Sequence, residues 1–566
     1  AKPAMLRTAV ALSLLACQAA AFSVSPLGST IRSQNRLGLS AGGRVASPTL
    51  SARQSRRMGA SGLRAGLLGG SGSEEVDTLV IGSGVSGSSL GFSLHQKGVD
   101  VLVTEARDVV GGNVITKEQD GFLWEEGPNT FQPTRQIMRL AVDLGLKEDV
   151  VFADHTLPRF VFWEDELFPL PGKLEDAPFF RLLSIPEKIR AGIGAIGLVA
   201  PRPKEEESVK EFIYRHLGEA VYKKIIDPFV SGVYAGDPEK LSMQSAFRKI
   251  ATLEEMGSTP GLVEGGILRM AEKAEDARVN YDPEIPVYKG GALGSFRKGL
   301  QTLPKTVRER LGEERVRTGW AVESIQKNGD GRYKAEFSTP DGKKTVVARS
   351  VAVTSPAHAT RTILEGMVPE VARLDDIHYP TVTSVTVAYP KEAFKDSVRR
   401  ERDILGGKKG LFGFGNLIPR SMNVRTLGTI WSSSLFPDRV PEGYEMLLNY
   451  IGGARDPLKY SPPIADLSDE EVVEVVHGDV SKILLKPGAP APKVLGVRKW
   501  PRAIPQYNKG YAAIRAEVDE GLARCPGLFL GGNYVSGVAF GDCVQWGVDT
   551  APMVEEYLKQ SPGGDV

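Results

Sequence analysis

Residues 76–87 read VDTLVIGSGVSG, a short apolar run that leads into a GxGxxG pattern, with helix-forming residues following as far as Gln96. In such a turn the first glycine allows a tight bend, the second lets backbone N–H groups approach a pyrophosphate, and the third lets the helix lie close to the strand. A second apolar run, 99–104, ends at Glu105, whose carboxylate can accept hydrogen bonds from a ribose. This order of segments predicts a Rossmann-like α/β domain that binds a dinucleotide. We expect the turn contacts to come from Gly82, Ser83, Gly84, Val85, Ser86 and Gly87.

Two further glycine-rich segments favour FAD over NAD as the dinucleotide. Residues 105–113 read EARDVVGGN, and this pattern resembles the double-glycine motif of the amine-oxidase-like flavoprotein superfamily. A Gly-Gly pair can bring backbone N–H groups close to phosphates and to the ribityl chain. Residues 527–533 (GLFLGGN), followed by a predicted helix over about 543–558, resemble the closing FAD element of the same superfamily. The superfamily usually has arginine at the position of Val109, so we expect Arg107 to supply part of the charge that neutralises the phosphates.

Residue matching to this superfamily extends the expected flavin site beyond the glycine turn and Glu105. The resemblance implies these flavin neighbours: Ala106, Gly111, Gly112, Asn113, Gly127, Pro128, Asn129, Thr130, Val322, Trp500, Gly532, Asn533, Val538, Ala539 and Phe540.

A closer resemblance covers the chain from residue 76 to about residue 558. Six segments in the same order are similar to the family of plastid-type protoporphyrinogen oxidases: 121–133, 158–160, 231–238, 294–300, 426–437 and 500–507. The resemblance implies that FAD accepts hydride from protoporphyrinogen IX and passes the electrons to molecular oxygen. The products would be protoporphyrin IX and hydrogen peroxide, at the step shared by haem and chlorophyll synthesis. Only one GxGxxG has its strand, helix and acid, so no second fold for NADPH is expected, which fits an oxidase.

The same resemblance implies four substrate contacts in a mostly apolar pocket. Arg159 would grip a propionate, which a guanidinium can do with two hydrogen bonds, and Gly232 would bring its backbone close to the substrate. Trp431 would stack on one pyrrole ring and Leu411 would pack on the opposite face of the macrocycle. The alternatives are a surface salt bridge for Arg159, a turn glycine for Gly232 and a core aromatic for Trp431. No histidine or lysine is identified as a general base.

The composition excludes several other classes of protein. The 566 residues contain 70 basic and 69 acidic side chains, but the first 73 hold nine basic residues and no acid, which leaves 61 basic against 69 acidic. A mildly acidic remainder argues against binding nucleic acid through bulk charge. The three cysteines form no CxxC and the six histidines no HxxxH, so neither a disulfide framework nor a metal site is expected.

The acid-free segment 1–73 predicts that the protein is targeted to a plastid. Residues 5–22 have the basic, apolar and small-residue regions of a signal peptide, and residues 23–73 have the Ser, Gly and Arg composition of a transit peptide. The tandem resembles the bipartite leader of algae whose plastids lie behind extra membranes. The alternative is a disordered basic tail.

The spacing of the motifs predicts a discontinuous FAD domain made of residues 74–145, 290–360 and 498–562. Residues 146–289 are expected to be helical, with one helical pattern over 205–226 that starts at a solvated acidic run. Their apolar stretch 189–199 is too short to span a bilayer, and either peripheral membrane contact or core packing would explain it. Residues 361–497 predict an α+β substrate domain. An amine oxidase, a carotene desaturase and a non-catalytic flavin or porphyrin carrier remain alternatives, and a homodimer is compatible with the sequence.

Overall fold

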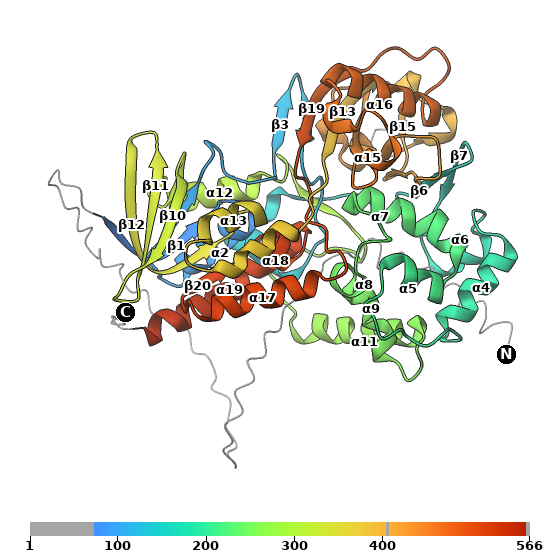
Figure 1. Cartoon of the computed structure of the whole chain (residues 1–566). Coiled ribbons are helices and arrows are strands. Elements are labelled where there is room, and N and C mark those ends of the chain that lie inside the picture. Colours follow the sequence, from blue (N-terminus) through green and yellow to red (C-terminus); the bar gives the residue numbers. More distant parts are fainter. Residues whose placement is uncertain (1–72, 403–406, 562–566) are drawn as a thin grey trace.

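The computed structural model describes residues 73–402 and 407–561, and two seven-stranded sheets organise the chain (Figure 1). The predicted leader, apart from Ser73, lies outside the described residues. Helices cover the first sheet, and a helical region lies between the second sheet and the lower edge of the view.

The first sheet has the order β10-β11-β12-β1-β2-β9, with β20 paired to β12. β1 runs parallel to β2 and to β12, as a Rossmann-like core requires. Its strands come from all three segments that we assign to the FAD domain, and the exact division of the chain stays a proposal. The bounds are β1 Glu74–Ile81, β2 Val101–Glu105, β9 Val316–Thr318, β10 Ala321–Lys327, β11 Tyr333–Thr339, β12 Gly342–Val353 and β20 Leu528–Leu530.

Two helices pack tightly together on this sheet, the one after the glycine turn (α2) and the last helix of the chain (α19). A Cβ atom placed on Gly547 of α19 would lie 2.7 Å from the backbone nitrogen of Leu90 on α2, so the two backbones come within contact of each other. The C-terminal segment therefore returns to the start of the fold.

The helices of this domain are α2 Val85–Gln96, α3 Arg135–Asp143, α12 Thr302–Leu311, α13 Ala357–Leu364, α17 Tyr511–Ala523, α18 Asn533–Ser536 and α19 Phe540–Gln560. Two antiparallel pairs accompany them, the hairpin of β3 Thr116–Gln119 with β4 Phe122–Glu125 and the long-range pair of β5 Val150–Phe152 with β8 Gly294–Phe296.

The second sheet has the order β19-β13-β18-β17-β16-β6-β7. Its strands are β6 Arg159–Trp163, β7 Glu166–Pro169, β13 Val382–Pro390, β16 Gly415–Leu417, β17 Thr426–Ile430, β18 Tyr444–Gly452 and β19 Lys493–Trp500. β6 and β7 come from the segment that we expected to be helical, so that expectation was incomplete. The remaining elements near this sheet are β14 Arg399–Glu401, β15 Lys409–Leu411, α14 Ser432–Leu435, α15 Asp456–Lys459 and α16 Asp469–Ile483.

The two faces of the second sheet have different surroundings. The register pairs Arg159 with Gly415, Gly415 with Ile430, and Ile430 with Leu448, and side chains alternate between faces along each strand. We call the face that carries Arg159, Leu417, Ile430, Leu448 and Tyr450 the α7 face, because helix α7 (Asp227–Tyr234) packs on Leu417. The opposite face carries Phe160, Phe162 and Asn416. We call it the α16 face, because Phe162 shares an apolar cluster with valines of α16.

The region 185–279 is helical but more broken than its sequence pattern suggests. The expected single helix over 205–226 is wrong, because Gly218 has a left-handed backbone (φ 86°) that ends α5 and starts α6. A π-helical stretch, Tyr222–Ile226, then leads into α7. The helices are α4 Ile185–Ala195, α5 Val209–His216, α6 Glu219–Val221, α7 Asp227–Tyr234, α8 Met243–Ala246, α9 Arg248–Ala251, α10 Leu253–Met256 and α11 Leu262–Val279. Short 3₁₀ turns occur at Lys147–Asp149, Leu174–Phe179, Pro369–Asp376, Lys391–Ala393, Asp396–Val398, Pro437–Arg439 and Ile464–Asp466.

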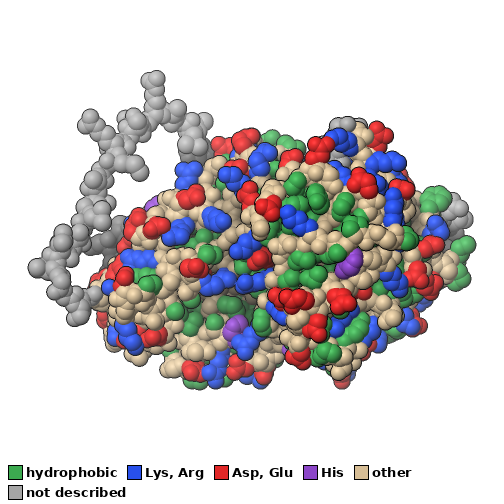
Figure 2. All heavy atoms as spheres, turned by 90° about the horizontal axis from the view of Figure 1, so that it is seen from above, with side chains coloured by type: hydrophobic (Ala, Val, Ile, Leu, Met, Phe, Trp, Pro, Cys, Tyr) green, Lys and Arg blue, Asp and Glu red, His purple; other side chains and the backbone are tan. Residues whose placement is uncertain are grey.

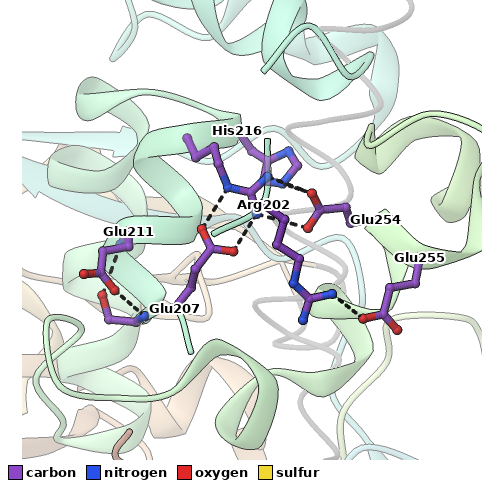
Figure 3. Close-up of polar contacts among 8 residues, drawn as sticks. Arg202, Glu207, Glu211, His216, Glu254 and Glu255 are labelled. Carbon is purple, nitrogen blue, oxygen red and sulfur yellow. Dashed lines mark hydrogen bonds and ion pairs between the residues drawn. The ribbon is translucent and has the colours of Figure 1, made fainter. Parts of the chain in front are cut away.

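A buried ionic cluster joins α5 to α10 in this region (Figure 3). Arg215 contacts Glu207 at 2.6 Å and Glu254 at 2.7 Å, and His216 Nε2 lies 3.6 Å from a Glu254 oxygen. Burial opposes the charge on Glu254, but its contacts with His216 and Arg215 outweigh burial and lower its pKa to about 2. Glu207 is therefore a structural ion-pair partner, and our prediction that the acidic run is a solvated helix start is wrong for this residue.

The outer surface is mixed in charge. Figure 2 shows acidic and basic side chains interspersed over the face seen from above. Within residues 73–402 and 407–561, no helix is both long enough and apolar enough to cross a bilayer.

Candidate functional site

The glycine turn after β1 is as tight as the sequence pattern requires. Gly82 has a left-handed backbone (φ 99°), and a Cβ atom on Gly87 would lie only 1.9 Å from the carbonyl oxygen of Gly82. The Thr354 hydroxyl, at the end of β12, donates to the carbonyl oxygens of Ile81 and Gly82 at 2.9 and 3.0 Å. The start of α2 is thereby fixed at the carboxyl end of the parallel strands.

The double-glycine segment lies against this turn and leaves a cradle. The Gly111 N–H donates to the Ser83 carbonyl oxygen at 3.0 Å. A Cβ atom on Gly84 would meet only the Cα atom of Gly112, at 3.9 Å, so the space beside Gly84 is open. No side chain of the described residues caps the N-terminus of α2, which leaves the N–H groups of its first turn available to a phosphate. These features fit the pyrophosphate of FAD.

Glu105 lies at the end of β2, directly beside the glycine turn. Its Oε2 atom accepts hydrogen bonds from the Ser83 backbone N–H and hydroxyl, both at 3.0 Å. Its Oε1 atom accepts from the Arg107 N–H at 3.1 Å and lies 3.6 Å from the Arg107 side chain. A carboxylate has about four acceptor positions, so room remains for ribose hydroxyls. Arg107 pairs here with Glu105, and Ala106 lies between them.

Val322, the residue matched to the adenine end of the cofactor, lies on β10 and is half-buried. The chain just before it contacts Glu105, because the Trp320 N–H donates to the Glu105 carbonyl oxygen at 2.8 Å. The neighbouring Gly319 N–H donates to the Arg107 carbonyl oxygen, also at 2.8 Å. The structure therefore brings the segment that contains Val322 next to Glu105.

A second group of matched residues surrounds the segment Gly127–Thr130, which we call the flavin turn. A Cβ atom on Gly127 would lie 1.9 Å from the Asn113 carbonyl oxygen and 3.9 Å from the Trp500 ring, so these three residues are close neighbours. Asn129 is buried, and its side-chain nitrogen has no hydrogen-bond partner within the described part of the chain. A buried donor without a partner fits an acceptor atom of a bound flavin.

The C-terminal element closes this region from the other side. Gly532 has a left-handed backbone (φ 95°) and approaches the Thr354 carbonyl oxygen, and the Ser536 hydroxyl donates to the Gly532 carbonyl oxygen at 2.9 Å. Phe540, at the start of α19, stacks on Phe131 with ring centres 5.6 Å apart. The matched residues Asn533, Val538 and Ala539 lie in α18 or between α18 and α19, whereas Pro128 and Thr130 belong to the flavin turn.

Arg159 and Gly232 both lie at the α7 face of the second sheet. Arg159 begins β6 and is half-buried, with its guanidinium carbon 5.3 Å from the centre of the Phe414 ring. Burial lowers the pKa of Arg159 to about 10, which keeps it a cation at neutral pH. Gly232 lies within helix α7, whereas its sequence context had suggested a turn. A Cβ atom there would lie 2.4 Å from a methyl carbon of Leu417, so glycine lets α7 lie close to the sheet.

Trp431 and Leu411 lie on the other side of the second sheet. Trp431 is fully buried, stacks on Phe160 at 5.3 Å, and donates from Nε1 to the Asn416 side-chain oxygen at 3.1 Å. Leu411 is also fully buried and belongs to the same apolar cluster. Their contact with the macrocycle stays a prediction, and in this structure Trp431 has the surroundings of a core aromatic.

One buried acid near the flavin turn was missed by sequence reasoning. Glu125 precedes the turn by two residues, and its carboxylate accepts from the Leu300 N–H at 2.8 Å and the Thr116 hydroxyl at 2.7 Å. Burial raises its pKa to about 7, although Arg439, at 3.7 Å, opposes the rise. Nothing in the segment GFLWEEGPNT distinguishes this acid from its half-buried neighbour Glu126, so no sequence signal could have found it.

Comparisons with known proteins place the chain in a family. A family model described as flavin containing amine oxidoreductase matches residues 86–554. The chain belongs to the flavin-containing amine oxidoreductases. Within this family it is 45% identical over 495 residues to protoporphyrinogen oxidase 1, chloroplastic, of Spinacia oleracea, which covers 86% of this chain and 85% of that protein. It is 46% identical over 489 residues to protoporphyrinogen oxidase, chloroplastic, of Oryza sativa subsp. japonica, covering 85% and 88%.

Solved structures support the fold of this flavin-containing amine oxidoreductase. The crystal structure of a putative protoporphyrinogen oxidase from Exiguobacterium sp. 255-15 matches with a TM-score of 0.65 at 23% identity, covering 87% of this chain and all of that one. The predicted fold class is confirmed, and so is the FAD cofactor expected from the double-glycine pattern. The individual cofactor and substrate residues stay predictions.

Proposed function

We propose that the protein oxidises protoporphyrinogen IX to protoporphyrin IX with FAD and molecular oxygen, releasing hydrogen peroxide in haem and chlorophyll biosynthesis. The observation that carries this proposal is the 45–46% identity, over 85–86% of the chain, to plant proteins named protoporphyrinogen oxidase. An amine oxidase or a carotene desaturase would share the glycine motifs but gives no reason for identity at this level to those plant proteins.

The residues of the site fit this reaction. Bound FAD supplies the hydride acceptor. The glycine turn, Glu105 and the double glycine would hold its phosphates and ribose, and the flavin turn and Trp500 would hold its reactive end. Arg159 would bind a propionate and so orient the macrocycle. Half-buried apolar side chains near Arg159, among them Phe414 and Ile430, would exclude water from the substrate macrocycle.

The choice of oxygen as electron acceptor rests on the sequence, in which a single GxGxxG has its strand, helix and acid. An anaerobic titration of the holoenzyme with protoporphyrinogen IX tests cofactor and substrate together. We expect the flavin absorbance to bleach and then to return, with one peroxide per oxidised flavin, when oxygen is admitted. A flavin that never bleaches would overturn the assignment and favour a carrier, whereas bleaching that oxygen does not reverse would overturn the choice of acceptor.

We further propose that the protein works in the plastid, in contact with a membrane surface. The chloroplastic names of the plant relatives and the predicted leader support the plastid location. For the membrane contact, helix α4 supports the proposal: Ile185, Ile189 and Ile193 follow one another at four-residue spacing and are 73%, 41% and 37% exposed. Phe179 and Leu198, on either side of α4, are 81% and 70% exposed. A poorly soluble substrate would reach such a site from the bilayer.

Vesicle sedimentation tests this contact. We expect the double change Ile185→Glu and Ile189→Glu to abolish binding to lipid vesicles while leaving activity in detergent unchanged. Met553→Glu is the matched control, because Met553 on α19 is 45% exposed and far from α4 in sequence. Equal binding by both variants would contradict the proposal. Light scattering on the same samples measures whether the protein forms the homodimer that the sequence allows.

A further inference from the structure

Three side chains of the second sheet donate hydrogen bonds to two consecutive carbonyl groups at the start of the flavin turn. The Ser384 hydroxyl donates to the Glu126 carbonyl oxygen at 2.7 Å, and Trp500 Nε1 donates to the same oxygen at 3.1 Å. The Tyr450 hydroxyl donates to the Gly127 carbonyl oxygen at 2.8 Å. The resemblance that assigned Trp500 to the flavin said nothing of Ser384 or Tyr450.

These donors come from three neighbouring strands, β13, β18 and β19, and share one face of the sheet. The register pairs Tyr450 with Ser384, and it pairs Val382, two residues before Ser384, with Trp500. Because side chains two residues apart point to the same face, all three lie on the α7 face. Arg159 lies on that face too, four strands away from Ser384 along the register. One sheet therefore carries both the cation expected to bind substrate and the donors that hold the flavin turn.

The flavin turn has little freedom on its other side. Gly127 is packed against the Asn113 carbonyl oxygen so closely that a Cβ atom would lie 1.9 Å from it. The turn is thus held between the double-glycine segment of the FAD domain and the α7 face of the second sheet. Any shift of the sheet relative to the FAD domain would have to break these hydrogen bonds or move the turn.

Tyr450 is suited to this task by its surroundings. Its ring packs with Ala235, Val382 and Leu427, so the side chain is fixed at both ends. Burial raises the pKa of Tyr450, and the nearby charge of Glu125 adds to the rise, so the phenol keeps its proton and remains a donor at neutral pH.

We propose that Tyr450 and Ser384 are positioning residues that fix the flavin turn, and with it the flavin, relative to the substrate-bearing face of the second sheet. The inference rests on the proposed function for its substrate but not for its cofactor. Hydride transfer depends steeply on the distance and alignment of the reacting atoms, so a small displacement of the turn should slow the chemical step more than it weakens binding.

The test compares Tyr450→Phe, Ser384→Ala and the double variant with Tyr333→Phe, all as holoenzymes. Tyr333 is the matched control, because it is also buried and its hydroxyl donates to a backbone carbonyl, that of Pro526, at 2.7 Å. We expect kcat with protoporphyrinogen IX to fall about tenfold in Tyr450→Phe, and further in the double variant, while KM changes less than about twofold. We also expect a shifted flavin absorbance spectrum and faster release of FAD in the absence of substrate. Tyr333→Phe should change only thermal stability.

Two results would overturn the proposal. The first is a Tyr450→Phe holoenzyme with the spectrum, FAD release rate and kcat of the wild type, and the second is an equal change of all three in Tyr333→Phe. The spectrum and the FAD release rate need no substrate, so they separate this inference from the proposed function. If the wild-type protein failed to oxidise protoporphyrinogen IX but the Tyr450 variant still shifted the flavin spectrum, only the substrate assignment would fail.

Discussion

Gly87 lies so close to Gly82 that a Cβ atom on Gly87 would be 1.9 Å from the Gly82 carbonyl oxygen, whereas one on Gly84 would meet nothing nearer than 3.9 Å. We therefore expect Gly87→Ala to push α2 away from β1 and to destabilise the protein even without cofactor. Gly84→Ala should leave the melting temperature of the apoprotein unchanged but weaken FAD binding at least tenfold, because its methyl group would occupy the phosphate cradle. Thermal melts of the apoproteins and FAD titrations measure both effects. Equal behaviour of the two variants would contradict the assignment of the cradle.

The half-buried position of Arg159 beside Phe414 leads to a prediction about substrate affinity. We expect Arg159→Ala to raise the KM for protoporphyrinogen IX about tenfold to a hundredfold, the range for loss of hydrogen bonds to a charged group. The FAD content should stay normal, since the cofactor residues lie on other segments. Arg332→Ala is the control, because Arg332 lies in the turn between β10 and β11, where its side chain is 42% exposed and pairs with Asp330. Loss of FAD from the Arg159 variant would instead assign this residue to folding.

The burial of Trp431 against Phe160 separates its two candidate roles. Trp431→Ala would leave a large cavity in the α16 face and is expected to destabilise the protein by about 3–5 kcal/mol. Trp431→Phe retains most of the ring but loses the hydrogen bond to Asn416, so it should cost only about 1 kcal/mol. Chemical denaturation and steady-state kinetics of both variants distinguish the roles. A raised KM in a Trp431→Phe enzyme of nearly normal stability would support stacking on a pyrrole ring, and an unchanged KM would leave Trp431 as a core residue.

The FAD-binding half of the molecule could be predicted from sequence because its signals are local. The strand before Gly82, the helix after Gly84 and the acid at Glu105 lie within 32 residues, and the structure has β1, α2 and β2 in that order. Each glycine there has a conformational reason that its spacing already indicates.

The second sheet could not be predicted in the same way, because it depends on contacts between distant segments. β6 pairs in parallel with β16, more than 250 residues later, and this register, together with that between β16 and β17, decides that Arg159 and Trp431 lie on opposite faces. Single residues also override a helical pattern, as Gly218 does between α5 and α6. The hydrogen bonds to the start of the flavin turn also join segments that are distant in sequence. Their donors, Ser384, Tyr450 and Trp500, share no sequence motif.

The buried Glu125 predicts how stability changes with pH. Its pKa in the folded protein is about 7, above its ordinary value of 4.5, so the folded state binds an extra proton between these two values. The stabilisation from this group is therefore complete below about pH 4.5 and is lost as the pH rises through 7, a change of about 3 kcal/mol. Glu125→Gln cannot ionise and should abolish this part of the pH dependence.

Melting temperatures of wild-type and variant holoenzymes between pH 5 and pH 9 check this prediction. We expect the variant to gain stability relative to the wild type as the pH rises, and the difference to level off above about pH 8, where Glu125 is ionised in the folded protein. Glu118→Gln serves as control, because Glu118 is exposed on the neighbouring strand β3. A difference between Glu125→Gln and wild type that stays constant with pH would mean that Glu125 does not titrate in this range. In that case the ion pair with Arg439, 3.7 Å away, would outweigh burial and keep the carboxylate ionised.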